Sequence, residues 1–98
     1  MESNLKKIEI MGMIKLKKAS GFDLVSADNV GAVKIVSNDV VIEYTTGYKT
    51  TIAGASNLVE ADVELCLGGI DEMNGASGKA NEIIALSSLV TGTTVASL

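Results

Sequence analysis

Short apolar runs separated by small polar residues dominate the first half of the chain. Five such runs cover residues 13–18, 22–27, 33–36, 40–45 and 48–53. The residues between them are types that tolerate the backbone of tight turns: Ser20-Gly21, Asp28-Asn29, Ser37-Asn38-Asp39 and Thr46-Gly47. This pattern predicts an antiparallel meander, and strands spaced this densely are typical of small bent sheets or closed barrels.

The segment 59–67 alternates apolar and other residues almost without fault. A period of two predicts a strand with its carboxylates on the outer face. A helix is the competing interpretation, because Asn57 and Glu60 have the spacing of a capping box, but a helix would point Leu65 away from the other apolar residues. We therefore expect a sixth strand here.

Helical spacing occurs towards both ends of the chain. Apolar residues recur every three positions between Leu5 and Met11, which predicts a short N-terminal helix in residues 1–12. The apolar positions in residues 79–90 predict a C-terminal helix. The tail 93–98 is short and uncharged, so it either packs as a last strand or docks on a neighbouring copy.

The length of 98 residues suits one domain, with a helix in residues 1–12, a β meander in 13–67, and a loop, helix and tail in 68–98. The expected fold is mainly β, with five to six antiparallel strands in a bent sheet or barrel of the Sm-like or SH3-like kind. Hydrophobic residues make up 47% of the chain and charged residues 20%, which excludes a disordered protein. Aromatic residues are only 3%, so the core must be aliphatic.

Missing residue types narrow the function further. The chain has no His, Arg or Trp, so it lacks the usual general base and the bidentate guanidinium. We expect a protein that is not an enzyme and holds no cofactor. One cysteine, Cys66, cannot form an internal disulfide, which fits a cytoplasmic protein, and no apolar run approaches the ~18 residues that a membrane span needs.

Charge is unevenly distributed along the chain. Residues 1–20 carry a net charge of +3 and residues 21–98 a net charge of −7, for a total of −4. An acidic pI near 4.6 argues against nonspecific nucleic-acid binding by the whole surface. Opposed charges also suit contacts in which the basic segment of one copy meets the acidic face of another, although two solvated faces of a monomer fit equally.

Two motifs are candidates for chemistry. Glu60, Asp62 and Glu64, if on one strand face, would lie about 7 Å apart and could bind a hard cation, but acids on a solvated strand face are ordinary. Residues 75–79 are reminiscent of a phosphate-binding loop, yet Ala80 stands where the magnesium-binding hydroxyl belongs. No catalytic or metal site is predicted from these residues.

Four residues are candidates for a single-stranded nucleic-acid surface. Lys15 and Lys17 would share one strand face beside the ring of Phe22. Tyr48 and Lys49 follow the predicted turn at Thr46-Gly47. Positive charge interleaved with aromatic rings is the minimum that such a surface needs. Exposed strand faces of no special function give the same pattern.

Three short motifs resemble the Sm/Lsm-like small barrels over about residues 3–59. Ile52-Ala53-Gly54 is similar to the end of the family's second motif, Tyr48-Lys49 to the aromatic-lysine pair of bacterial members, and Gly21-Phe22-Asp23 to part of the first motif. The resemblance implies ring assembly by pairing of the fourth strand with a neighbour's fifth, and makes Lys49 a candidate pore or ligand residue. Ala53 and Thr50 replace basic residues of the family, which puts RNA contact in doubt.

The leading functional hypothesis is a non-enzymatic small-barrel module that acts as a homo-oligomer, because the edges of an open meander need partners. A single-stranded RNA- or DNA-binding protein is the first alternative. A structural component of a viral particle or another large assembly is the second.

Overall fold

In the computed structural model, residues 12–74 and 83–98 form seven strands and one helix. In chain order these are β1 (Met13–Lys17), β2 (Phe22–Ser26), β3 (Val30–Val36), β4 (Asp39–Tyr44), β5 (Tyr48–Gly54), α2 (Glu60–Asn74), β6 (Ile83–Ile84) and β7 (Val90–Ser97).

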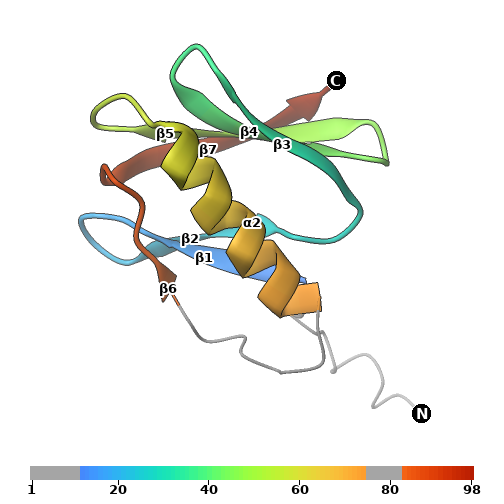
Figure 1. The fold of residues 1–98 in the computed structure, drawn as a ribbon, viewed down its shortest axis with the longest axis horizontal. Helices are drawn as coiled ribbons and strands as arrows, with labels where there is room; N and C mark the ends of the chain where they lie inside the picture. The colour runs from blue at the N-terminus through green and yellow to red at the C-terminus, as the bar shows by residue number, and fades with distance from the viewer. Residues whose placement is uncertain (1–11, 75–82) are drawn as a thin grey trace.

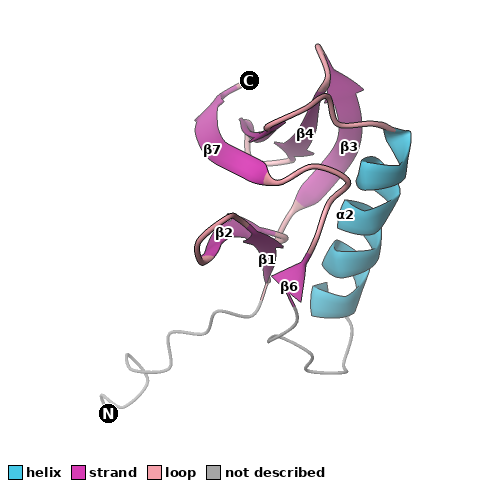
Figure 2. Ribbon diagram, turned by 90° about the vertical axis from the view of Figure 1, so that its left-hand side faces the viewer, coloured by secondary structure: helices cyan, strands magenta, loops and turns pink. Residues whose placement is uncertain are grey.

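The strands form two sheets, and α2 lies along one side of the molecule (Figure 1). In the three-stranded sheet, β1 pairs antiparallel with β2 and parallel with β6. The four-stranded sheet has the order β3-β4-β5-β7, with all neighbours antiparallel. Figure 2 shows α2 beside β3 and β6, and the helix contacts both of these strands and β1.

Tight turns set the registers within the hairpins. Ser37 and Asn38 have φ angles of 52° and 69°, so both central residues of the β3–β4 turn are left-handed, as a two-residue hairpin that follows the strand twist requires. Gly47 has a φ of 98° at the end of the β4–β5 turn, where its N–H donates to the Tyr44 carbonyl. Both turns lie where Asn and Gly predicted them.

The core lies between the two sheets and α2 and is mostly aliphatic, as the composition predicted. Its most deeply buried side chains come from both sheets, the helix and the segment before the helix, and include Leu16, Ile42, Ile52, Leu58 and Cys66. Because each layer contributes, no layer could bury its apolar face alone.

The mainly β fold and the five predicted strands of the first half are confirmed, but these strands do not close into a barrel within residues 12–74 and 83–98. The reason is the connection at Asp28-Asn29, which leads from β2 into the other sheet and not back along β2. Among the residues that the structure describes, the two sheets are joined by strand-like pairing only at an isolated bridge between Lys18 and Val90.

The predicted strand 59–67 is wrong, because this segment forms the first part of α2. Its inward-facing residues have helical spacing: Asp62, Val63, Cys66 and Ile70. An aspartate on the buried face, and Leu65 and Leu67 each 45% exposed on the outside, erase the apolar stripe of this helix. The buried aspartate and the two exposed leucines also give the sequence the apolar–polar alternation that is typical of a strand.

The C-terminal helix predicted for residues 79–90 is also wrong over its described part. Residues 83–84 form β6, residues 85–89 form a connection, and Val90 begins β7. Neighbouring β-branched residues suit a pleated strand, and β6 is held by its pairing with β1. The prediction of a last strand in the tail is confirmed. The predicted N-terminal helix (1–12) and the loop 75–79 lie outside the described residues, except for Gly12.

Candidate functional site

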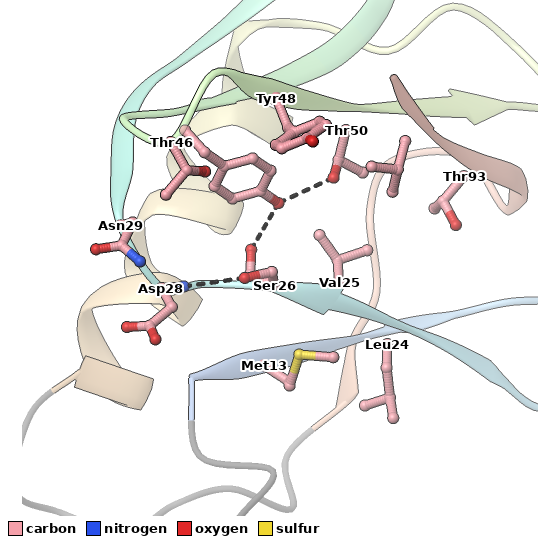
Figure 3. A pocket seen from close by; sticks show the side chains of 12 residues that line it. Met13, Leu24, Val25, Ser26, Asp28, Asn29, Thr46, Tyr48, Thr50 and Thr93 are labelled. Carbon is pink, nitrogen blue, oxygen red and sulfur yellow. Dashed lines mark hydrogen bonds between the residues drawn. The ribbon is translucent and has the colours of Figure 1, made fainter. Parts of the chain in front are cut away.

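A cleft of about 440 Å³ separates β2 from the C-terminal half of β7 (Figure 3). Its lining is apolar, aromatic and hydroxyl-bearing, with Asp28 the one ionisable carboxylate: Met13, Leu24, Val25, Ser26, Asp28, Asn29, Tyr44, Thr46, Tyr48, Thr50, Thr93 and Val95. Tyr48 and Val95 are 52% and 68% exposed, so much apolar surface faces solvent here. No lysine lines the cleft, so it offers no positive charge to a phosphate.

A chain of hydrogen bonds holds one end of the cleft together. The Tyr44 hydroxyl lies 2.8 Å from the Ser26 carbonyl, to which it donates, and 2.9 Å from the Thr50 hydroxyl. Because the one phenolic proton goes to Ser26, the Thr50 hydroxyl donates to Tyr44. Burial raises the pKa of Tyr44, so the phenol stays protonated and keeps this arrangement at neutral pH. The two sheets are thus tied together through one side chain.

The edge of β7 that faces the cleft has unpaired backbone groups. The Leu98 N–H donates to the Gly47 carbonyl directly opposite at 2.9 Å. Because bonded and non-bonded pairs alternate along an antiparallel ladder, the N–H and C=O groups of residues 93, 95 and 97 point away from β5. Beyond its first residue, Val90, β7 has no strand on this side within the described residues.

The opposite edge of the same sheet, β3, is protected. Lys34 stands on it and forms an ion pair with Glu43 at 2.8 Å. A register shift between Val30 and Ala32 bends the strand, and residues of α2 pack beside Gly31. Charge, a bulge and cover by another element are the usual protections of an edge strand. Residues 91–98 have neither a charge nor a proline.

The carboxylate of Asp62 fixes the connection that leads into β7. It is fully buried and accepts three hydrogen bonds, from the Val59 N–H at 2.8 Å and from the Ser87 N–H and hydroxyl at 2.7 Å each. Burial acts to raise the pKa of Asp62, but the three donated bonds outweigh it and lower the pKa. Asp62 therefore acts as a structural anion that joins the N-terminus of α2 to the connection just before β7.

The predicted nucleic-acid residues are distributed over three surfaces. Lys15 and Lys17 share the outer face of β1, where the Lys15 ammonium lies 4.9 Å from the centre of the Phe22 ring. Tyr48 lines the cleft, whereas Lys49, the next residue of β5, is on the opposite face of the four-stranded sheet. The structure thus unites Lys15 with Lys17 but does not unite them with Tyr48 or Lys49.

The acidic residues that could have bound a cation lie on different sides of α2, and the thiol of Cys66 is buried. Glu60 and Glu64 lie on the outside of α2 and Asp62 on the inside, because the segment is a helix and not a strand, and residues 12–74 and 83–98 contain no cluster of three metal-ligating side chains. Cys66 is fully buried, and burial followed by the charge of Asp62 raises the pKa of its thiol to about 12. At neutral pH that thiol is protonated and out of reach of a substrate.

Sequence reasoning gave Tyr44 and Val95 no role in this site, and it considered Asp62 only as a cation ligand and Thr50 only as a position where the resembled family has a basic residue. The available signal was the uncharged, β-branched run in residues 90–98, which the prediction split between a helix and a tail.

Comparisons with protein-family models, with curated proteins and with solved structures give no match for this chain. In the part of the chain that the structure describes, the helix is too short and too polar to cross a membrane. Functional inference therefore depends on the geometry of the site.

Proposed function

We propose that this protein is a non-catalytic assembly module, and that a second copy adds its own β7 to the free edge of β7. The observation that carries the proposal is the contrast in protection: β3 has a charge, a bulge and helix cover, whereas β7 has eight uncharged residues and outward-pointing backbone groups. Main-chain hydrogen bonds to an added strand would satisfy those groups.

The pairing fits a twofold axis near Val95. Two antiparallel copies of β7 centred there align Val95 with its equivalent and residue 93 with residue 97, and both of these pairings bring outward-pointing N–H and C=O groups together. Side chains of residues 93, 95 and 97 share the face of β7 that borders the cleft. A partner's Val95 would then cover the exposed Val95 and the rim of the cleft near Tyr48.

The test is solution mass, measured by sedimentation equilibrium over a range of protein concentrations at high salt. The wild-type chain is expected to be a dimer, and Val95→Lys, which places a charge in the new ladder, is expected to be a monomer. Val36→Lys puts the same charge on β3, at a residue that is 45% exposed, and serves as the matched control with unchanged mass.

Two results would overturn the proposal. One is a wild-type chain that stays monomeric at the highest concentration reached. The other is a Val95→Lys variant with the mass of the wild type, since edge pairing cannot be indifferent to a charge at its centre. Circular dichroism of both variants checks that the change in mass does not come from unfolding.

A further inference from the structure

The outer face of the three-stranded sheet combines positive charge with apolar surface. Lys15 and Lys17 lie on this face of β1, Phe22 faces Lys17 from β2, and Ile83 faces Lys15 from β6. Phe22 and Ile83 are 42% and 44% exposed. We name these four residues the basic sheet face.

Neither lysine of this face has a carboxylate partner among residues 12–74 and 83–98, whereas Lys18 and Lys34 both have one. The contact that Lys15 makes is with the ring of Phe22. Two ammonium groups without carboxylate partners keep this face positively charged, although the chain as a whole has a net charge of −4.

The outer face of α2 has the opposite character. Glu60, Glu64 and Asp71 lie within about 40° of one another around the helix axis, and the exposed Leu67 lies beside them. None of the three acids has a cationic partner within the described residues. We name these four residues the acidic helix face.

The two faces belong to different sides of the molecule. The inner face of β1 carries Ile14 and Leu16 towards α2 and the core, so the basic sheet face looks away from the helix. In Figure 2, α2 lies on one flank of the molecule. Leu67 and Asp71 also line a cavity with residues 30–32 of β3, so the acidic helix face borders the β3 edge and not the three-stranded sheet. One copy therefore cannot join its own two faces.

We propose that the basic sheet face binds the acidic helix face of a second copy. The charges are complementary, with two ammonium groups opposite three carboxylates, and each face has apolar side chains that the contact would cover. Because the two surfaces differ, the contact is heterologous and each copy has one of each, so it builds a ring or an open chain. It is independent of β7 pairing, which is isologous.

The experiment reverses the charge of each face and then mixes the products, in the Val95→Lys background where β7 pairing is blocked. Lys15→Glu/Lys17→Glu makes both faces acidic, and Glu60→Lys/Glu64→Lys makes both basic. Lys49→Glu changes a lysine on the far face of the other sheet and is the control. All substituted side chains are outside the core, so the fold is expected to persist, and circular dichroism checks this.

Sedimentation velocity is the readout, at ionic strengths of about 0.01 M and about 1 M, where the Debye length is about 30 Å and about 3 Å. The unreversed chain and Lys49→Glu are expected to associate at low salt and to dissociate at high salt. Each reversed variant alone should associate at least about tenfold more weakly at low salt. An equimolar mixture of the two should recover the association, since each then supplies the face that the other needs.

Three outcomes would overturn the inference: a monomer at low salt, a reversed variant that associates like its parent, or a mixture that stays monomeric. If the unreversed chain is monomeric but binds a single-stranded oligonucleotide through Lys15 and Lys17, the basic sheet face binds nucleic acid and not a second copy. Failure of β7 pairing would show separately, as a Val95→Lys variant with unchanged mass at high salt.

Discussion

The two edges of the four-stranded sheet differ in how far their backbone groups are protected from pairing with another chain. β3 begins with a bulge, carries the Lys34–Glu43 ion pair and lies against α2. β7 is longer by one residue, has no charge and leaves its backbone groups open beside a cleft. An unprotected edge lowers the solubility of a monomer, so the asymmetry between the two edges agrees with the proposed pairing of β7 with a second copy.

The largest expected effect comes from loosening the entrance to β7. Asp62→Ala removes the buried acceptor of three hydrogen bonds, one from Val59 and two from Ser87, and we expect the free energy of unfolding to fall by about 3 kcal/mol in urea titrations. Amides of β7 should then exchange faster with solvent while those between β3 and β4 keep their relative protection. Glu64→Ala, an exposed change on the same helix, should cost little; equal losses from both would contradict the role of Asp62.

The same carboxylate predicts how stability depends on pH. The pKa of Asp62 is lower in the folded chain than in the unfolded chain, so the unfolded chain binds more protons between the two values. The stabilisation is present in full above the ordinary aspartate pKa of about 3.9 and is lost as pH falls towards the folded value. The difference in unfolding free energy between the wild type and Asp62→Asn should therefore be constant near neutrality and shrink in acid. A difference that grows in acid would reverse the sign of our assignment.

Next in size is the tie between the sheets beside β7. Tyr44→Phe removes the donor to the Ser26 carbonyl and the acceptor of Thr50, with an expected cost of about 1–2 kcal/mol in thermal or urea unfolding. Tyr48→Phe is the matched control, because that hydroxyl makes no hydrogen bond within the described residues. If Tyr48→Phe lowers the free energy of unfolding as much as Tyr44→Phe does, the hydrogen bonds of Tyr44 do not hold the two sheets together at the cleft.

These predictions separate what the sequence could foresee from what it could not. Local signals, such as Asn38 and Gly47 in their turns and the β-branched runs between them, correctly placed the first five strands. Which strands pair was not local information: β1 meets β6 about 70 residues away, and Asp28-Asn29 reads as a hairpin turn although it leads between sheets. The anionic Asp62 on the buried side of α2 was hidden for the same reason, since its Ser87 partner is distant in sequence.

A smaller effect is expected in the helix that covers β3. A Cβ at Gly68 meets open space, so Gly68→Ala should stabilise α2 by about 0.5–1 kcal/mol through helix propensity. A Cβ at Gly69 meets the Ile84 side chain of β6, so the free energy of unfolding of Gly69→Ala should be at least about 1 kcal/mol lower than that of Gly68→Ala. Thermal unfolding of the two variants side by side measures this difference. Equal stabilities would mean that β6 does not pack on the helix as closely as described.

The smallest effect on stability should come from removing the protection of β3. Lys34→Thr breaks an exposed ion pair worth about 0.5 kcal/mol or less. It nevertheless removes the charge from β3 and leaves that edge only its bulge and α2 as protection, so we expect assemblies larger than those of the wild type by light scattering. Unchanged mass would show that the bulge and α2 suffice to protect β3 without the lysine.

The pairing of β5 with β7 has a kinetic consequence. Ile52 and Thr93 face each other across 40 residues of intervening chain, so the ladder closes only after a long loop has been ordered. Until then the β3–β4–β5 meander exposes the β5 edge, which the C-terminal strand of any nearby molecule matches as well as its own. Refolding yield should therefore fall with protein concentration, and strand-exchanged dimers should accumulate among the slow-folding molecules.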